Sequence, residues 1–259
     1  MPILLETNLP LTLWRKGKVR DVYDLGDKLL MVATDRISAF DVVLPCGIPD
    51  KGKVLNQLSA FWFKKTANIV PNHFIKAVDN LETLRDHHIG DCPDYLAGRS
   101  MIITKAKPIP IECIVRGYLF GSAWIEYKKT GAIGNTRLPP EMKEGQELPQ
   151  PLFTPTTKSE TKKDYCMNYL AIRKLGIKDL LGELEVKSLL IYSYAQSHAQ
   201  NKGIIIADTK LEFGLVNDKL TLIDELLTPD SSRFWDTSQY ELGRSQPSLD
   251  KQPVRDWLL

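Results

Sequence analysis

The sequence lacks the usual signs of metal-cluster, membrane and secreted proteins. Its four cysteines stand at positions 46, 92, 113 and 166, and no two of them form the C-x-x-C pair of zinc and redox sites. It contains no run of about 18 apolar residues that would predict a membrane span. No basic segment precedes an apolar core near the N-terminus, so no secretory signal is evident. We therefore expect a cytoplasmic, soluble protein whose thiols are free.

Two common phosphate-binding patterns are also missing, namely G-x-G-x-x-G and G-x-x-x-x-G-K-[ST]. Nor is there an excess of either charge, because 34 basic and 32 acidic residues leave a net charge of +2. This balance argues against a nucleic-acid-binding protein that relies on bulk positive charge. Any anion site must come from a local arrangement of side chains.

The length of 259 residues and the apolar fraction of 43% suffice for one large or two modest domains. Hydrophobic periodicity and turn residues predict a hairpin at 14–34, helices at 54–67, 124–130 and 184–200, strands at 100–104 and 111–115, and a hairpin at 204–225. Residues 131–164 are expected to form a long loop, and 226–250 to be irregular. Strands and helices come in blocks, which favours an α+β fold with antiparallel sheets.

The segment 208–214, DTKLEFG, is the most informative part of the chain. Alternation along a strand would place Asp208, Lys210 and Glu212 on one face and apolar side chains on the other. If Asn217-Asp218-Lys219 forms the loop of the hairpin, Glu212 lies opposite Asp224 on the returning strand.

Two carboxylates placed opposite each other repel unless a cation lies between them. Mg²⁺ that also binds nucleotide phosphates meets this need, because it takes one or two carboxylates and completes its shell with phosphate oxygens and water. Lys210 could neutralise phosphate charge at the same place. A solvated charged face, with Lys210 as an internal counter-ion, explains the pattern equally well.

Two further segments could bind anions. In Lys16-Gly17-Lys18, the glycine would let a phosphate approach the backbone amides and the two lysines could reach its oxygens. In Arg116-Gly117-Tyr118-Leu119-Phe120-Gly121-Ser122, Ser122 stands at the expected start of a helix, where Arg116 could bind the same phosphate. The alternatives are a solvated basic cluster for the first segment, and a structural arginine with a simple helix cap for the second.

Other candidates are less specific. Ser38 and Asp41 are close enough in sequence to converge on a ligand, although both residue types also cap helices. Lys158 follows a Thr-Pro-Thr-Thr segment inside the expected long loop, where a solvated lysine is the alternative. Arg233, Lys251 and Arg255 each add a cation after a turn.

Taken together, six motifs resemble the SAICAR synthetase family in its own order, from Lys16 to about Arg255. The motifs are GKVRDVY, SAFD, ECIVRGYLFGS, TPTTKSE, DTKLEFG and DELLTPDSSRFW. The resemblance implies an ATP-dependent ligase of purine biosynthesis, which couples the carboxylate of CAIR to the amino group of L-aspartate through an acyl phosphate. ADP and phosphate are released.

The resemblance also implies roles for individual residues. Lys16, Gly17, Lys18, Lys210 and Glu212 would bind ATP, and Glu212 and Asp224 would hold Mg²⁺. Lys210, Lys158 and Asp224 would act in catalysis. The substrates would be bound by Ser38, Asp41, Arg116, Ser122, Asp164, Arg233, Lys251 and Arg255.

The implied fold has two α+β domains with the active site between them. Residues 1–115 would form the nucleotide-binding domain, laid out like the small lobe of a protein kinase, and residues 116–259 would complete the site. A small-molecule kinase that uses the same Mg–ATP site is the alternative function, but the sequence has neither the H-R-D nor the D-F-G signature of kinases. A nucleotide- or RNA-binding module is a third possibility, which balanced charge disfavours.

Overall fold

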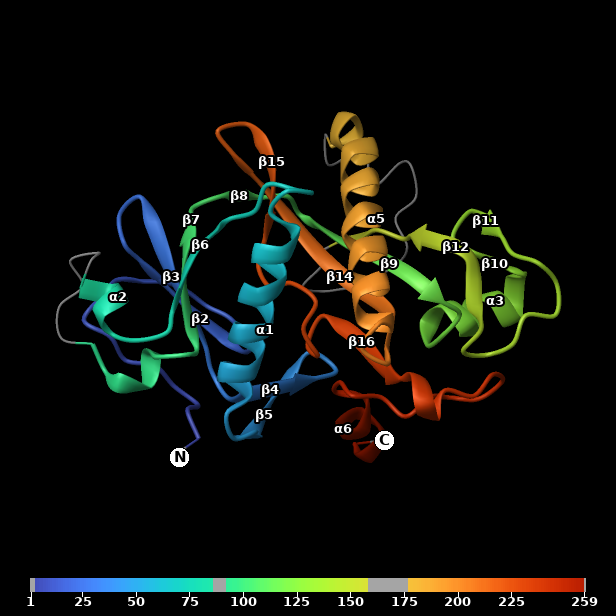
Figure 1. Ribbon diagram of the computed structural model, residues 1–259, viewed down its shortest axis with the longest axis horizontal. Coiled ribbons are helices and arrows are strands. Elements are labelled where there is room, and N and C mark those ends of the chain that lie inside the picture. The colour runs from blue at the N-terminus through green and yellow to red at the C-terminus, as the bar shows by residue number, and fades with distance from the viewer. Residues whose placement is uncertain (1–2, 86–91, 158–176, 259) are drawn as a thin grey trace. The chain divides into compact units, whose positions relative to one another are not determined.

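The computed structural model describes residues 3–85, 92–157 and 177–258. It has the predicted mixed α+β architecture, with several antiparallel sheets and few helices (Figure 1). The chain divides into two compact units. The first comprises Met1–Lys107, Gly214–Thr228 and Val254–Leu259, and the second comprises Pro108–Phe213 and Pro229–Pro253. Within the described ranges, no helix has the length and apolarity needed to cross a membrane.

The first unit is built on a five-stranded antiparallel sheet. Its strands follow the order β1 (Leu13–Lys16), β2 (Arg20–Asp24), β3 (Lys28–Ala33), β7 (Ser100–Thr104) and β6 (Phe74–Val78). The turn between β2 and β3 lies inside the hairpin predicted at 14–34, and Gly26 adopts a φ of 84° there. The expected hairpin and the expected strand at 100–104 are therefore confirmed.

Both faces of this sheet are covered, which explains why β3 reads as a continuous apolar run. Leu30, Val32 and Ile102 pack with other apolar residues on one face. Helix α1 (Lys51–Thr66) packs against β3, β6 and β7 and buries Leu55 and Phe63 (Figure 1). The other elements before residue 108 are β4 (Arg36–Ala39), β5 (Val42–Gly47), α2 (Glu82–Arg85), the 3₁₀ helix η1 (Asp94–Leu96) and β8 (Lys107–Pro108).

The second unit centres on β9 (Ile111–Tyr118) and β14 (Ile204–Val216), which pair antiparallel. β12 (Glu147–Phe153) and β13 (Thr156–Thr157) pair with β9, and β16 (Ser232–Asp236) pairs with β14. Helix α5 (Lys178–Gln200) packs on β9 and β12. Helix α3 (Ser122–Thr130) ends at Gly131, which has the left-handed conformation expected of a C-terminal cap.

Two segments that were expected to be irregular contain strands. The predicted loop at 131–164 holds β10 (Ala132–Ile133), β11 (Thr136–Arg137), β12 and β13 in its described part. The segment 226–250 holds β16 and the 3₁₀ helix η2 (Thr237–Gln239), and α6 (Gln252–Trp257) follows it. Leu148, Leu152 and Trp235 are buried in these strands. Burial of these apolar side chains overrides the loop signal of the surrounding Pro, Gly and Thr residues.

The buried face of α5 does not include all of its large apolar residues. More than half of the surface of Val186 and of Leu190 is exposed. The helix instead buries Leu184, Ser188, Ile191, Tyr192, Ala195 and Ala199. Small residues on this face, among them Ser188, Ala195 and Ala199, let the helix approach the sheet closely.

The hairpin loop between β14 and β15 (Lys219–Ile223) has two residues, not the three expected. Asn217 and Asp218 have φ values of 49° and 60°, as a type I′ turn requires of both central residues. The register therefore differs by one residue from the expected one. Asp224 lies beyond the end of β15 with a φ of 68°, so it is not a ladder partner of Glu212.

Gly117 is expected to be indispensable for stability. A Cβ atom at this position would lie 1.9 Å from the hydroxyl oxygen of Tyr192, which itself donates to the carbonyl of Ile206. We expect Gly117→Ala to lower the free energy of unfolding by roughly 3 kcal/mol, because the clash displaces a buried ring and its hydrogen bond. Equilibrium denaturation with urea measures this change.

Gly182→Ala in α5 is the matched control, because a Cβ there has open space. It should raise stability by about 0.5–1 kcal/mol through helix propensity. Equal stability of the two variants would contradict the packing described for Gly117.

Candidate functional site

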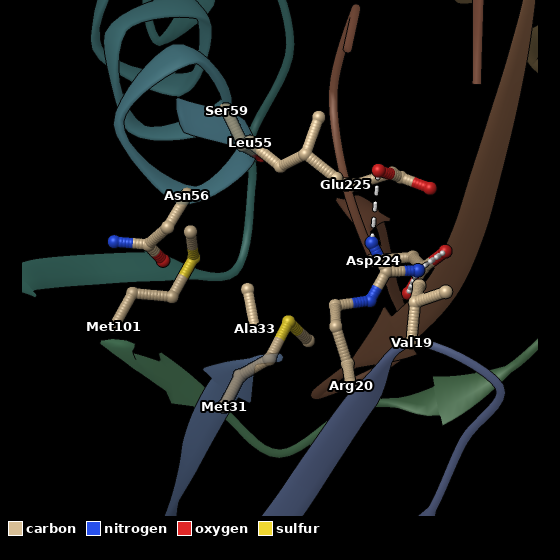
Figure 2. Close-up of a pocket in the computed structure, with 10 residues that line it drawn as sticks. All are labelled: Val19, Arg20, Met31, Ala33, Leu55, Asn56, Ser59, Met101, Asp224 and Glu225. Carbon is tan, nitrogen blue, oxygen red and sulfur yellow. Dashed lines mark hydrogen bonds and ion pairs between the residues drawn. The ribbon is translucent and has the colours of Figure 1, made fainter. Parts of the chain in front are cut away.

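Asp224 is held by an arginine from β2. The guanidinium of Arg20 lies 2.9 Å from the Asp224 carboxylate and 3.0 Å from that of Glu225 (Figure 2). All three side chains belong to the first unit and are mostly buried, with 18%, 22% and 8% of their surfaces exposed. They border a small pocket whose other lining residues are Val19, Met31, Ala33, Leu55, Asn56, Ser59 and Met101.

His73 is buried next to the backbone of Asp224 and is neutral. Burial lowers the pKa of His73 to about 3; a hydrogen bond to the Asp224 backbone opposes the shift, and the positive charge of Arg20 adds to it. The ring packs against Phe63 with 5.1 Å between ring centroids. The backbone of Asp224 is therefore hydrogen-bonded to a histidine side chain that stays uncharged at neutral pH.

The stability of the protein should fall below pH 6.5 because of His73. The unfolded state binds a proton at His73 near pH 6.5 and the folded state only near pH 3, so stability present above pH 6.5 is lost at about 1.4 kcal/mol per pH unit. Relative to His73→Gln, which does not titrate, the wild type should lose about 2 kcal/mol more between pH 7 and pH 5. Urea denaturation at both pH values tests this, and parallel losses in the two proteins would refute it.

The loop from Lys16 to Lys18 connects β1 to β2. The amide of Gly17 donates to the carbonyl of Arg20 at 2.7 Å, and a Cβ on Gly17 would lie only 2.9 Å from that oxygen. Glycine is thus required by a close backbone approach. Lys16 pairs with Glu6 at 3.3 Å, and Lys18 with Asp41 at 2.5 Å.

Ser38 and Asp41 belong to a hairpin, so the alternative of helix caps does not apply. Ser38 lies in β4 opposite Val43, and Phe40 and Asp41 form the turn to β5 with φ values of 49° and 65°. The structure brings Asp41 to Lys18. It shows no hydrogen bond between Ser38 and Asp41 among the contacts described.

In the second unit, Lys210 and Glu212 share one face of β14 as predicted. The ammonium of Lys210 lies 2.7 Å from Glu212 and 3.0 Å from Glu112 on β9. Leu211 and Phe213 are fully buried on the other face. The two acids together exceed the charge of the lysine, which suits a site that also receives a cation.

Arg116 and Ser122 also come together. The guanidinium of Arg116 donates to Ser122 Oγ at 3.4 Å, to Thr154 Oγ1 at 3.1 Å and to Asp208 at 3.4 Å. Arg233 on β16 donates to the same Asp208 carboxylate, and its guanidinium carbon lies 5.4 Å from the centre of the Phe120 ring. Two arginines share one carboxylate, so a net positive charge remains next to the N-terminus of α3, as a phosphate requires.

The other substrate-binding and catalytic residues predicted from the sequence either lie elsewhere in the structure or are not among the described residues. Lys251 is 3.8 Å from the buried carboxylate of Asp230 in the second unit, and Arg255 lies in the last turn of α6. Lys158 and Asp164 fall outside the described residues.

The charged residues in these clusters that were not assigned from the sequence include Arg20, Asp208 and Glu112. Two of them carried a usable signal. Asp208 lies two residues before Lys210 on the same strand face, and Arg20 lies two residues after Lys18. Glu112 becomes a neighbour of Lys210 only through the β9–β14 pairing, which the sequence did not predict.

The chemistry of Glu212 and Asp224 fits Mg²⁺. Both offer carboxylate oxygens, and their side chains remain 10% and 22% exposed. The described residues contain no group of three or more His, Cys, Asp or Glu side chains that could hold a metal by themselves. Mg²⁺ bound with a nucleotide does not need such a group, since phosphates and water supply the other ligands.

Comparisons with known proteins identify close relatives over nearly the whole chain. The family model for SAICAR synthetase matches residues 13–259. A phosphoribosylaminoimidazole-succinocarboxamide synthase of Thermodesulfovibrio yellowstonii is 52% identical over 99% of this chain and 87% of its own length. The solved SAICAR synthase of Saccharomyces cerevisiae, complexed with SAICAR, has a TM-score of 0.86 at 44% identity, covering 98% of this chain and 87% of that one. A solved SAICAR synthetase in complex with ADP has a TM-score of 0.74 at 29% identity, covering 93% of this chain and 89% of that one.

Proposed function

This chain belongs to the SAICAR synthetase family, and on that premise we propose that it joins the carboxylate of CAIR to the amino group of L-aspartate. It is an ATP-dependent ligase of purine biosynthesis. The observation that carries the proposal is the family match over residues 13–259. The solved relatives with bound SAICAR and ADP agree with it.

The proposed reaction has two steps. A carboxylate oxygen of CAIR attacks the γ-phosphorus of ATP, and ADP leaves. The aspartate amine then attacks the acyl carbon of the resulting acyl phosphate, phosphate leaves, and the nitrogen loses a proton to give the amide. Both steps need accurate positioning and neutralisation of negative charge more than covalent help from the protein.

Nucleotide binding is assigned to residues that can hold phosphate or metal. Lys16, Gly17 and Lys18 would bind the ATP phosphates, with Lys210 close to the nucleotide. Glu212 and Asp224 would hold Mg²⁺, which when bound neutralises phosphate charge. Arg20 keeps the Asp224 carboxylate in place at 2.9 Å. Lys158 would act near the nucleotide or the acyl phosphate.

Substrate binding is assigned mainly to the arginine cluster of the second unit. Arg116, Ser122 and Arg233 would bind the phosphate of CAIR, which is supported by their convergence around Asp208. Ser38 and Asp41 would contact the imidazole or the aspartate. Asp164, Lys251 and Arg255 would complete the sites for the anionic substrates.

Two expectations stay predictions. One is that residues 1–115 bind the nucleotide, in the layout of a kinase small lobe, and that residues 116–259 complete the site. The other is a cytoplasmic location, which the purine-biosynthesis assignment favours.

The function is tested by measuring ATP turnover and product formation with CAIR, in the presence and absence of L-aspartate. We expect the amide SAICAR to form only when both co-substrates and Mg–ATP are present. Steady phosphorylation of CAIR that ignores L-aspartate would instead identify a small-molecule kinase. Absence of turnover under all conditions would refute both.

A further inference from the structure

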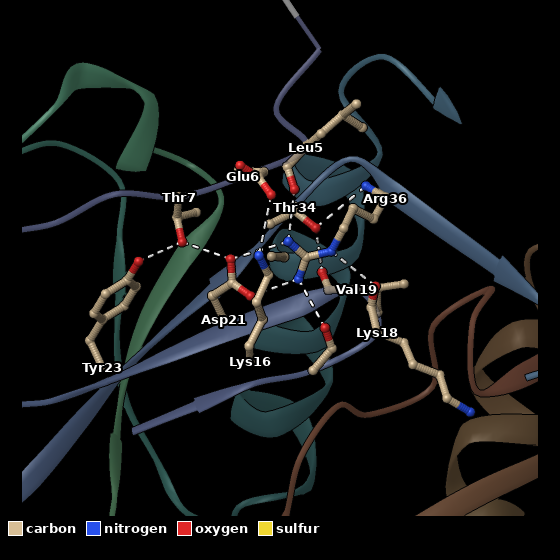
Figure 3. Close-up of polar contacts among 12 residues, drawn as sticks. Leu5, Glu6, Thr7, Lys16, Lys18, Val19, Asp21, Tyr23, Thr34 and Arg36 are labelled. Carbon is tan, nitrogen blue, oxygen red and sulfur yellow. Dashed lines mark hydrogen bonds and ion pairs between the residues drawn. The ribbon is translucent and has the colours of Figure 1, made fainter. Parts of the chain in front are cut away.

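The loop between β1 and β2, which contains Gly17, is hydrogen-bonded to a buried arginine from β4. Arg36 is only 7% exposed, and each of its five N–H donors has a partner (Figure 3). Two donors bind the Asp21 carboxylate at 2.7 and 3.2 Å. The other three bind the carbonyl oxygens of Gly17 at 3.0 Å, Lys18 at 3.0 Å and Leu5 at 2.8 Å.

Arg36 is itself held in place by an ion pair with Asp21. Asp21 is 1% exposed and neutralises the guanidinium. It also accepts a hydrogen bond from Thr7 Oγ1 at 2.7 Å, and Thr7 Oγ1 lies 2.6 Å from the Tyr23 hydroxyl (Figure 3). A buried polar network with every charged group paired is rigid. The orientation of Arg36 is therefore fixed before any ligand arrives.

The carbonyl contacts determine where the loop amides point. In a trans peptide the C=O and the following N–H point in opposite directions, and none of the described peptides is cis. Because the carbonyls of Gly17 and Lys18 both turn toward Arg36, the N–H groups of Lys18 and Val19 both turn away from it. Within the described part of the chain, no protein group accepts from either N–H. The Lys18 side chain also points away from Arg36 (Figure 3).

We propose that Arg36 is a positioning residue for the nucleotide phosphates. Holding two consecutive carbonyls, it presents the amides of Lys18 and Val19 as a preformed anion-binding pair on the outer side of the loop. Arg36 does not touch the nucleotide; it acts through the backbone. This inference rests on the proposed function, because it takes the loop as the place where the ATP phosphates bind.

Arg36→Lys tests the proposal, with Arg99→Lys as the matched control. Lysine keeps the charge near Asp21 but loses the planar fork that holds both loop carbonyls. Arg99 is also a buried arginine of the first unit, 2.9 Å from the fully buried Asp35, but its carbonyl partner is Ala33 in β3 and not the loop. Both variants disturb a buried ion pair, and only Arg36→Lys disturbs the loop.

We expect Arg36→Lys to raise the KM for ATP by roughly 10- to 100-fold, as small misplacements of binding groups do, with little change in the KM for CAIR. Arg99→Lys should leave the KM for ATP unchanged even if its midpoint of thermal unfolding falls equally. Equal effects of the two variants on the KM for ATP would overturn the proposal and leave Arg36 a purely structural residue.

A measurement on the wild type keeps the proposal testable if Arg36→Lys does not fold. Titration of ¹⁵N-labelled protein with Mg²⁺ and a non-hydrolysable ATP analogue should shift the amide signals of Lys18 and Val19 more than those of Leu25 and Gly26 in the next turn. Saturable binding without such a shift would overturn the inference alone. Failure of the wild type to form SAICAR would refute the proposed function instead.

Discussion

Asp224→Asn is expected to lower turnover of Mg–ATP by about 10²–10³-fold, the usual cost of removing one strong electrostatic stabiliser from an active site. Asparagine keeps the size of the side chain and can still accept a hydrogen bond from Arg20 at the observed distance of 2.9 Å. What it loses is the negative charge that would hold Mg²⁺. The fold should persist, since Arg20 keeps Glu225 as a partner at 3.0 Å and no buried charge is left unpaired. Steady-state kinetics at varied Mg²⁺ concentration measures the effect.

Asp24→Asn is the control for this prediction. Asp24 is also in the first unit, its side chain is 24% exposed, and it pairs with Lys105 at 2.7 Å. It therefore matches Asp224 in burial and pairing, but it is the last residue of β2. Its substitution should leave turnover unchanged. Full turnover in Asp224→Asn would show that Asp224 is not a metal ligand. The same would follow if excess Mg²⁺ did not change the turnover of Asp224→Asn.

Arg116→Ala is expected to lower kcat/KM for CAIR by roughly 10- to 100-fold, because a hydrogen bond between charged groups in a mostly buried site contributes about 1.5–3 kcal/mol. The loss should appear mainly in the KM for CAIR, and the KM for ATP should change little. Asp208 keeps Arg233 as a partner in this variant, so no buried charge is left unpaired. Kinetics with each substrate varied in turn separates the two KM values.

Arg137→Ala supplies the matched control, since Arg137 is an exposed arginine of the same unit on β11. Its loss tests whether removing any positive charge weakens the binding of an anionic substrate. Equal increases in the KM for CAIR and for ATP in Arg116→Ala would remove Arg116 from the CAIR phosphate site. An equal effect of Arg137→Ala would point to a general electrostatic effect.

Local sequence signals predicted the elements that depend on nearby residues. The β2–β3 hairpin, helix α3 with its glycine cap, and the shared face of Lys210 and Glu212 all follow from turn residues or from a period of two. The pairing of Arg116 with Ser122 was also expected, because both residues flank one strand-to-helix connection. Each of these features depends on residues that lie close together in the sequence.

Features that depend on distant contacts were missed. Strand β16 was not predicted because its pairing with β14 and the packing of Trp235 are contacts with residues distant in the sequence. The two-residue turn at Asn217 and Asp218 was misjudged because a cross-strand pair of Glu212 and Asp224 was assumed. Arg20 was overlooked as a partner of Asp224, since the two residues are 204 positions apart. Arg36 was not singled out, because its five contacts appear only in the folded chain.

Binding of the ATP-associated Mg²⁺ by Glu212 and Asp224 can be tested by locating the metal. A crystal structure of the protein with Mg²⁺, a non-hydrolysable ATP analogue and CAIR would show its ligands. We expect one oxygen of each carboxylate at about 2.0–2.1 Å from a Mg²⁺ that also contacts nucleotide phosphate. A nucleotide-bound Mg²⁺ with neither carboxylate in its coordination shell would contradict it.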